Sequence, residues 1–299
     1  MAQNNPVARS SLFIINFERM SSYYCLMAGA PDITLDDARG ALSVADFKEE
    51  LAIQLTEADK KLMSYLYLQY DCQNLVKLLK NPEAEISPLG NYSREQYMDL
   101  INSSTEENPN ADGFPAFMLN FLRDFSTNKE KKSYFPEDAI LLEYYQHAMN
   151  CPDQMMREWF SMNLNVTNIL TALIAKKYGW NVADYIQGDN EVCEMIRNNS
   201  NTRDFDLGYE LDYVGDLMKI VDCDDPVEKE KRIDAFKWLW LEDQTFMDVF
   251  SIDAVFAYVC KLEMLERWAK LDVETGRETF RQIIENLRGE ARVPEEFKR

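Results

Sequence analysis

One histidine and two neighbouring polar residues form the first group whose spacing could support chemistry. Glu143, His147 and Cys151 follow at i, i+4 and i+8, which places them on one face of a helix and resembles a metal-ligand set. Three ligands from one helix seldom close a tetrahedral site, and Pro152 follows the last of them directly. We therefore expect no metal here and interpret His147 as a residue at the negatively polarised end of a helix.

A second acidic group matches the D-D-x-x-E pattern that all-α prenyl-transferring enzymes use to hold magnesium. It consists of Asp224, Asp225 and Glu228, and clustered carboxylates suit hard cations. However, Pro226 follows Asp225, so Asp225 also fits the N-cap position of a helix that starts with proline. A magnesium site would need a second acidic pattern on a facing helix, and residues 36–37 do not supply one. A magnesium-dependent all-α prenyl-transferring enzyme is therefore kept as the alternative function.

Other catalytic supports are missing from the sequence. It has no G-x-G-x-x-G, Walker or G-x-S-x-G pattern, and a single histidine leaves little material for triads or acid–base pairs. We predict no catalytic residue, no cofactor and no enzymatic activity of the chain itself. Acidic residues exceed basic ones by 52 to 32, a net charge of −20, which disfavours nucleic acid and anionic membrane surfaces and favours a basic protein partner.

The cysteines and apolar runs favour a cytoplasmic protein. The six cysteines are far apart and include no C-x-x-C pair, which is typical of reduced, buried thiols. Residues 12–17 are apolar, but Glu18 and Arg19 interrupt them, so they make a poor signal peptide. No stretch approaches the ~18 uncharged apolar residues of a membrane span.

The expected elements that must position these residues are all helices, separated by polar loops at 103–114 and 126–135. Cap patterns of Ser, Thr or Asp, often with Pro, open most of them, and Asn-Pro or Gly closes them. Residues 23–32 could form either a strand or a first helix. Phe246 and Val249 are expected in the apolar stripe of the last long helix. The predicted helices are 43–53, 56–80, one opening at 93, one opening at 136, 152–178, 225–240, 245–271 and 277–288.

The fold class is therefore predicted to be all-α. We expect residues 1–19 to be a flexible extension and 20–299 a single helical domain. This domain could comprise two or three pseudo-repeated bundles, at about 41–125, 136–200 and 205–290.

A weak internal repeat supports this division. The pattern around Asp71 and Asn74 can be laid over that around Asn165 and Asn168 with a constant offset of 94 residues. In each copy a polar residue and an asparagine lie one turn apart on a mostly apolar helix. Buried amides usually bond backbone or neighbouring side chains, so these residues could fix how two helical units pack. Chance similarity between amphipathic helices is the competing explanation.

The last two long helices supply the candidate interface residues. Trp238 and Trp240 cannot both occupy the same helix face, and an outward tryptophan is a candidate interface anchor. The other candidates are aromatic and charged side chains expected at the surface. The full set is Trp238, Trp240, Tyr258, Lys261, Glu263, Glu266 and Arg267.

Two stretches resemble known families. Residues 257–268, Ala-Tyr-Val-Cys-Lys-Leu-Glu-Met-Leu-Glu-Arg-Trp, are similar to a pattern near the C-terminus of the socket subunit of V-type ATPases, and the Asp71/Asn74 and Asn165/Asn168 turns resemble the D-x-x-N turns of that family. From Tyr23-Tyr24-x-Leu26 onward, including Ala45-Asp46-Phe47, the chain looks like a bacterial family encoded within V-type ATPase operons.

The resemblance to the socket subunit implies a funnel of three similar helical bundles that sits on the membrane rotor ring and receives the central stalk. We therefore expect a non-catalytic coupling subunit of a V-type ATPase or ATP synthase. Its partners would be stalk and membrane-ring subunits, and it would lie in the cytoplasm, peripheral to the membrane. A clear third copy of the repeat is missing, and a general helical adaptor is a further alternative.

Overall fold

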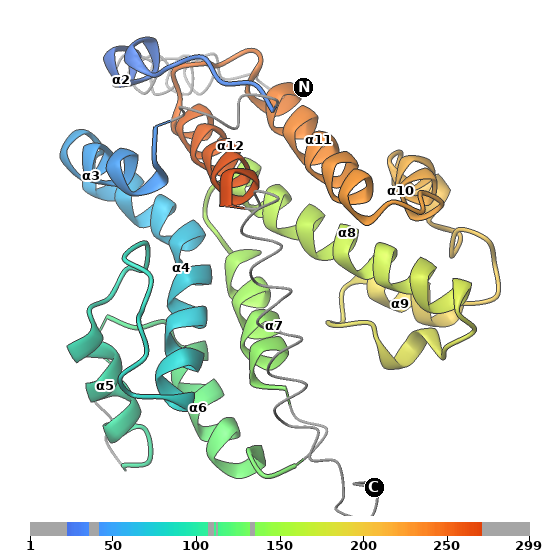
Figure 1. Ribbon diagram of the computed structural model, residues 1–299, viewed down its shortest axis with the longest axis horizontal. Helices are drawn as coiled ribbons and strands as arrows, with labels where there is room; N and C mark the ends of the chain where they lie inside the picture. The colour runs from blue at the N-terminus through green and yellow to red at the C-terminus, as the bar shows by residue number, and fades with distance from the viewer. Residues whose placement is uncertain (1–22, 36–41, 107–110, 112, 132–134, 271–299) are drawn as a thin grey trace, which may run out of the picture.

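The computed structural model describes residues 23–35, 42–106, 111, 113–131 and 135–270. The described residues form α-helices and two short 3-10 turns, with no β-strand among them, so the predicted all-α fold is confirmed (Figure 1). Two predictions, the extension at 1–19 and the helix at 277–288, lie outside the described residues.

The helices have these bounds: α2 Tyr24–Gly29, α3 Val44–Gln54, α4 Glu57–Lys80, α5 Arg94–Ser103, α6 Ala116–Asn128, α7 Pro136–Ala148, α8 Gln154–Lys177, α9 Glu191–Asn198, α10 Val214–Val221, α11 Pro226–Thr245 and α12 Ile252–Lys270, with 3-10 turns η1 Val182–Asp184 and η2 Leu207–Tyr209.

Local capping explains where most of these helices start. Ser43 and Thr56 each accept a hydrogen bond from the backbone N–H three residues on, and Ser93 forms a full capping box with Gln96. Asp225 caps α11, with Pro226 in the first helical position. Each such cap contributes about 1 kcal/mol. The predicted starts at these four residues are therefore correct.

Several boundaries differ from the sequence-based expectation. Helix α6 continues to Asn128, so residues 126–128 of the expected loop 126–135 are helical. Residues 24–29 form a helix, so the strand alternative is wrong. Helix α8 is capped by Asp153 and begins at Gln154, which places Pro152 ahead of the cap and not in the first turn.

A further difference lies between the last two long helices. Helix α11 continues to Thr245, and the next helix begins only at Ile252, because the Ser251 hydroxyl accepts from the N–H of Ala254 and caps α12. Phe246 and Val249 therefore lie in the connecting turn with exposed side chains, and their assignment to the apolar stripe of the last helix is wrong.

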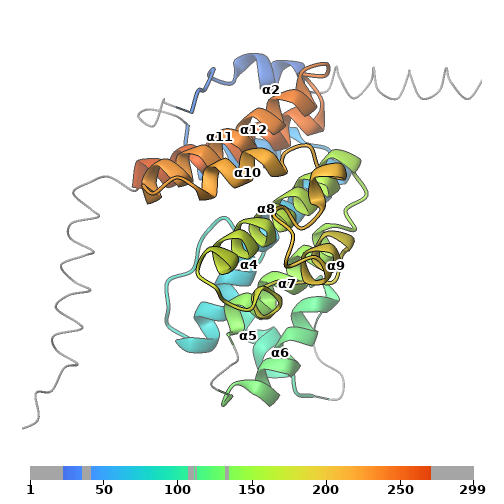
Figure 2. The ribbon, with the colours of Figure 1, turned by 90° about the vertical axis from the view of Figure 1, so that its right-hand side faces the viewer.

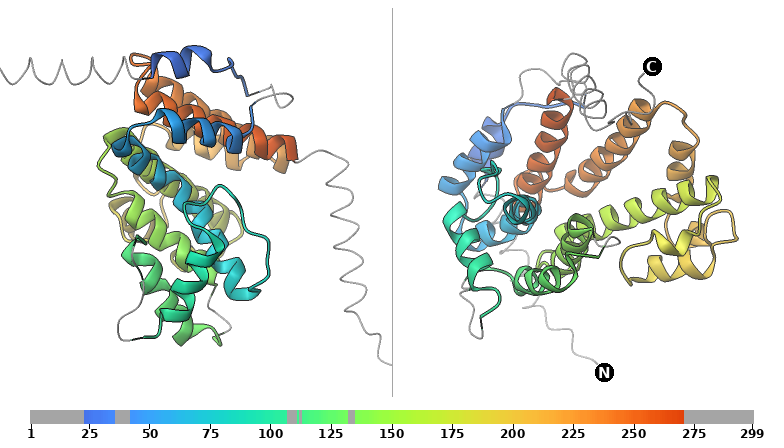
Figure 3. Two further views of the ribbon diagram at one scale, coloured as in Figure 1. Left: turned by 90° about the vertical axis from the view of Figure 1, so that its left-hand side faces the viewer. Right: turned by 60° about the horizontal axis from the view of Figure 1, so that its bottom comes forward.

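The helices follow one another around the molecule. α4 packs against α7, α7 against α8, α8 against α10, α10 against α11, α11 against α12 and α12 against α3. Figure 2 shows α10, α11 and α12 lying together across one end of the molecule, above α4, α7 and α8. The right-hand view of Figure 3 shows the long helices arranged around a common centre.

One hydrophobic core runs through these helices, from Tyr23 near the start of the described chain to Leu265 in α12. Its largest members include Tyr97, Phe121 and Phe256, each 2% exposed or less. Full burial of such a side chain contributes about 1.5–3 kcal/mol. Within the described part, no helix is both long and apolar enough to cross a bilayer.

Candidate functional site

Two helix–loop–helix units carry the residues of the internal repeat. In the first unit, the loop after α4 returns along the helix, and Asn74 holds it. The Asn74 amide donates to the carbonyl of Ser87 at 3.0 Å, and its oxygen accepts from the Ser87 N–H at 2.7 Å. One turn earlier, the Asp71 carboxylate accepts from the Asn91 backbone and side chain, both at 2.6 Å, and from the Tyr97 hydroxyl. We call Asp71 and Asn74 the first clamp.

The second unit repeats this arrangement on α8. The Asn168 amide donates to the carbonyl of Gln187 at 2.8 Å and accepts from its N–H at 3.0 Å, the same pair of bonds that Asn74 makes. One turn earlier, Asn165 accepts from the side chain of Asn190 at 2.9 Å. We call Asn165 and Asn168 the second clamp. Both clamps lie on helices of 24 residues, α4 and α8.

A glycine allows each loop to approach its clamp. A Cβ on Gly90 would lie only 2.6 Å from the Asp71 carboxylate and 2.7 Å from the Tyr97 hydroxyl, so a side chain cannot fit there. In the second unit, Gly188 has φ +95°, a conformation that other residues rarely adopt. The two loops therefore need glycine for different reasons, one for space and one for backbone conformation.

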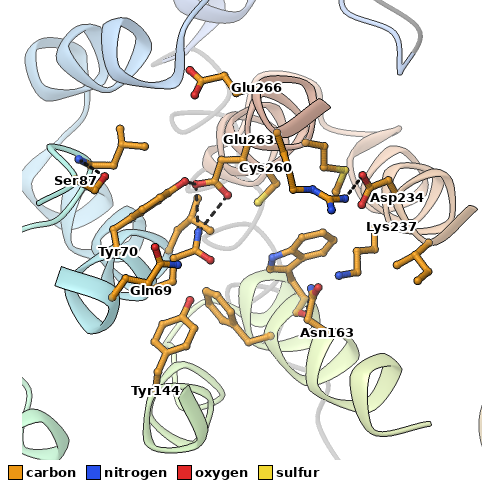
Figure 4. Close-up of a pocket in the computed structure, with 18 of the residues that line it drawn as sticks. Gln69, Tyr70, Ser87, Tyr144, Asn163, Asp234, Lys237, Cys260, Glu263 and Glu266 are labelled. Carbon is orange, nitrogen blue, oxygen red and sulfur yellow. Dashed lines mark hydrogen bonds and ion pairs between the residues drawn. The ribbon is translucent and has the colours of Figure 1, made fainter. Parts of the chain in front are cut away.

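A groove of about 560 Å³ opens between the two units and the last two long helices. Aromatic side chains form much of its wall, and ionisable groups face it from α11 and α12 (Figure 4). Its lining includes Gln69, Tyr70 and Gln73 from α4, Tyr144 and Tyr145 from α7, Trp159, Phe160 and Asn163 from α8, Glu230, Asp234 and Lys237 from α11, and Cys260, Glu263, Glu266 and Arg267 from α12.

Glu263 is the central carboxylate of this groove. The Tyr70 hydroxyl donates to it at 2.8 Å and the Gln69 amide at 3.2–3.3 Å (Figure 4). Burial raises the pKa of Glu263 to about 7; the bonds from Tyr70 and Gln69 oppose this rise, and the nearby Glu266 carboxylate adds to it. No Lys or Arg among the described residues forms an ion pair with Glu263 that would counter the effect of burial on its pKa.

Lys237 faces the same groove from α11. No described residue forms an ion pair or hydrogen bond with its ammonium, and burial lowers its pKa although Asp234 partly offsets the shift. The Asp234 carboxylate is itself occupied, since Arg267 and the indole N–H of Trp268 donate to it. The groove thus contains a carboxyl and an amine that lie on different helices and do not pair with each other.

The structure places the predicted interface residues largely within the chain's own contacts. Trp238 is only 6% exposed, and the ammonium of Lys261 lies 4.8 Å from the centre of its ring. Tyr258 is 8% exposed and donates to the carbonyl of Pro31. Trp240 packs on Trp159, with ring centres 5.7 Å apart.

The charged members of that predicted set are also engaged. Glu266 accepts from the backbone N–H of Val44 at 2.6 Å, which ties α12 to α3. Arg267 pairs with Glu230 as well as with Asp234, and Lys261 pairs with Glu242. Glu263 is the member that lies in the groove without a cationic partner among the described residues.

The two candidate chemical groups from the sequence have structural roles. The imidazole of His147 stacks on Tyr65 at 5.1 Å and packs against Phe117, and burial lowers its pKa. Asp225 caps α11, and Glu228 pairs with Arg232 one turn later. Asp224 is fully exposed.

These three acids lie outside the groove lining. In the part of the chain that the structure describes, no three His, Cys, Asp or Glu side chains are placed to hold a metal.

Two features were not predicted from the sequence. One is the groove, and the other is a group of exposed aromatic rings at the end of α8, Tyr178, Trp180 and Tyr185. Polar residues on the α4 surface, Gln69 and Gln73, were a signal of the groove, since they interrupt an otherwise apolar face. The exposed rings had a compositional signal, because Trp180 follows the glycine that ends a helix and lies outside any periodic pattern.

One family model, described as "Protein of unknown function (DUF2764)", matches residues 20–291 and so covers most of the chain. No curated protein and no solved structure matches this chain.

Proposed function

The chain belongs to this family, and we propose that it serves as a non-catalytic coupling subunit of a V-type ATPase or ATP synthase. In this proposal the chain links the central stalk to the membrane rotor ring through protein contacts. The observation that carries the proposal is the pair of matched clamps, which build two helical units with the same internal bonds.

The clamps support this function because they serve rigidity. A subunit that transmits torque must hold its helices in fixed relation under load, and bonds from a buried amide to a loop backbone fix that loop against its helix. The D-x-x-N turn at Asp71 and Asn74 resembles turns of the V-type ATPase socket subunit, and here it provides those bonds. Asn165 and Asn168 do the same in the second unit.

Charge gives a second line of support. The net charge of −20 favours a basic protein partner, and Glu263 presents a carboxyl that has no cationic partner among the described residues. A basic side chain entering the groove would pair with it.

The magnesium-dependent enzyme is less well supported. It requires Asp224, Asp225 and Glu228 to face further carboxylates across a cavity, whereas Asp225 caps a helix and Glu228 pairs along that helix. A general helical adaptor shares the fold and differs in its partners alone, so co-purification separates it from the coupling subunit.

The test is affinity purification of the tagged full-length chain from cells that express their own V-type ATPase. We expect stalk and ring subunits in fixed proportion to the bait. Among variants that circular dichroism shows to be folded, the Asn74→Ala, Asn168→Ala double variant should lose them, while Asn120→Ala, at an exposed asparagine on α6, should retain them. Recovery of the bait without any ATPase subunit would contradict the proposal.

A further inference from the structure

Three aromatic rings pack in a row at the surface just beyond the end of α8, the first pair stacked and the second tilted. Tyr178 and Trp180 have ring centres 5.4 Å apart with planes at 27°, and Trp180 and Tyr185 have centres 5.5 Å apart with planes at 30°. The three side chains are 65%, 51% and 46% exposed, respectively. We call these three residues the aromatic ladder. Contiguous exposed aromatic surface is a common mark of a binding site.

The backbone beneath the ladder is well fixed. Gly179 takes φ +71°, and the N–H of Trp180 donates back to the carbonyl of Ala175 at 2.8 Å, which ends α8 in a Schellman-type turn. The N–H of Tyr185 donates to the carbonyl of Val182, whose side chain is buried. The rings are therefore presented by an ordered scaffold, which lowers the entropic cost of binding.

The surroundings of the ladder are acidic. Residues 178–196 contain four acids, Asp184, Asp189, Glu191 and Glu194. The next residue, Arg197, is engaged in donating to the carbonyls of Ile186 and Gly188. The two lysines just before this stretch are turned to other contacts. Lys176 donates to the carbonyl of Thr202 and lies over the ring of Phe205, and Lys177 lies 4.0 Å from Asp224.

We propose that the aromatic ladder is a docking surface for an arginine-rich segment of a partner protein. A guanidinium can stack on the outer face of the ladder while Asp184, whose Oδ1 accepts from the Asn181 amide at 2.9 Å, accepts a hydrogen bond through its other oxygen. Arginine fits better than lysine because its planar group is weakly hydrated and stacks on aromatic faces, whereas an ammonium offers only a point charge. This inference does not depend on the ATPase assignment.

Two other classes of partner fit the observations less well. Proline-rich segments insert their rings between separated aromatic side chains, and these rings already pack against one another. Anionic lipid would be repelled by the four acids. Both classes become outcomes of the test.

The experiment measures binding of two labelled peptides to the full chain by fluorescence anisotropy. One peptide alternates arginine with glycine, and the other has lysine at each arginine position. Both will be attracted by the acidic chain, so the difference between them isolates stacking. We expect the arginine peptide to bind roughly tenfold more tightly, a factor within the range of cation–π energies.

Variants then locate the site. Trp180→Ala should weaken the arginine peptide about tenfold and change the lysine peptide less than about twofold, while Trp180→Phe keeps a ring and most of the affinity. Asp184→Asn should weaken the arginine peptide by a smaller factor. The control is Phe246→Ala, a likewise exposed ring in the α11–α12 turn, which should change neither peptide. Circular dichroism checks that each variant is folded.

Equal affinity for the two peptides, or no effect of Trp180→Ala on the arginine peptide, would overturn the proposal. Trp180-dependent binding of a proline-rich peptide or of anionic vesicles, with none for the arginine peptide, would also overturn it. Since the co-purification experiment uses other variants, failure here leaves the proposed function to its own test.

Discussion

The two clamped units differ in one chemical respect although their bonds match. The first clamp places a carboxylate, Asp71, at the position where the second has an amide, Asn165. Around Asp71 the chain supplies three donors, and the ammonium of Lys48 lies close enough to interact, bound to the carbonyls of Leu89 and Gly90. In the second clamp Asn165 and its partner Asn190 are both neutral. A cation holds this loop too, because Arg197 donates to the carbonyls of Ile186 at 3.0 Å and Gly188 at 2.6 Å.

This difference indicates what the repeat preserves. The asparagine that holds the loop backbone is the same in both units, at Asn74 and Asn168. The residue three positions earlier differs in charge between the units, Asp71 in one and Asn165 in the other, and its hydrogen-bond partners differ as well. We infer that the amide-to-backbone pair is the structural requirement and that the charge at the other position is accommodated locally. Burial raises the pKa of Asp71, which reflects the cost of that charge.

The largest effects should come from removing the shared bonds. Asn74→Ala leaves both the N–H and the carbonyl of the partly buried Ser87 without their partner, so it should lower the unfolding free energy by about 3 kcal/mol. Asn168→Ala leaves the N–H of Gln187 without its partner, while the Gln187 carbonyl still accepts from the Cys193 thiol at 3.2 Å, so this loss should be about 2 kcal/mol. The two losses should add, since the sites share no contact. Urea denaturation measures this, with Asn120→Ala as the exposed control. A near-neutral result at either site would show that the asparagine does not stabilise that unit.

The glycine in each loop should differ in how strongly it resists substitution. Gly90→Ala places a methyl group 2.6 Å from the Asp71 carboxylate and should cost about 3 kcal/mol by overpacking. At Gly188 the nearest atom would be 3.6 Å away, so Gly188→Ala should cost only about 1–2 kcal/mol, through its positive φ. Thermal unfolding ranks them. A larger loss of stability in Gly188→Ala than in Gly90→Ala would show that strain at a positive φ costs more than the steric clash with Asp71.

The raised pKa of Glu263 in the groove predicts that the unfolding free energy depends on pH. The pKa of Glu263 is about 7 in the folded chain against 4.5 for the free group, so the folded state keeps a proton that the unfolded state loses between these values. Stability therefore falls as pH rises from about 4.5 to 7. Glu263→Gln should remove this loss and stabilise the chain at pH 8 by about 3 kcal/mol, with little change near pH 4.5.

The control for this experiment is Glu49→Gln, at an exposed glutamate on α3. Denaturant unfolding across pH 4–9 measures both variants. A Glu263→Gln profile that stays parallel to the unmodified chain would show that Glu263 is not the group responsible.

The smallest effect concerns Asp225. Asp225→Ala removes the cap of α11 and should lower the unfolding free energy by about 1 kcal/mol. Magnesium with diphosphate should shift the melting temperature of neither form. A magnesium-dependent rise that disappears in Asp225→Ala would instead favour the prenyl-transferring enzyme.

Local signals predicted much of the fold. Ser43, Thr56 and Ser93 cap their helices through bonds to residues three positions away, so sequence alone is enough to find them. The end of α11 was harder to place, because the break before α12 depends on Ser251 and on a turn that leaves Phe246 exposed.

The site depends on contacts that sequence spacing cannot provide. Glu263 and Tyr70 are 193 residues apart, so their hydrogen bond follows from the packing of α12 near α4. The repeat pointed to Asn74 and Asn168 but not to their partners Ser87 and Gln187, which belong to loops without periodicity. For Trp238 and Trp180, exposure is decided by which neighbouring element covers the ring.

The proposed coupling function is tested most directly by measuring how ATP hydrolysis is coupled to ion transport in membranes from cells that lack this chain. If the chain has this function, coupled transport should fall sharply without it. The unmodified chain should restore transport, and the Asn74→Ala, Asn168→Ala double variant should not. Full coupled transport in its absence would contradict the proposed function.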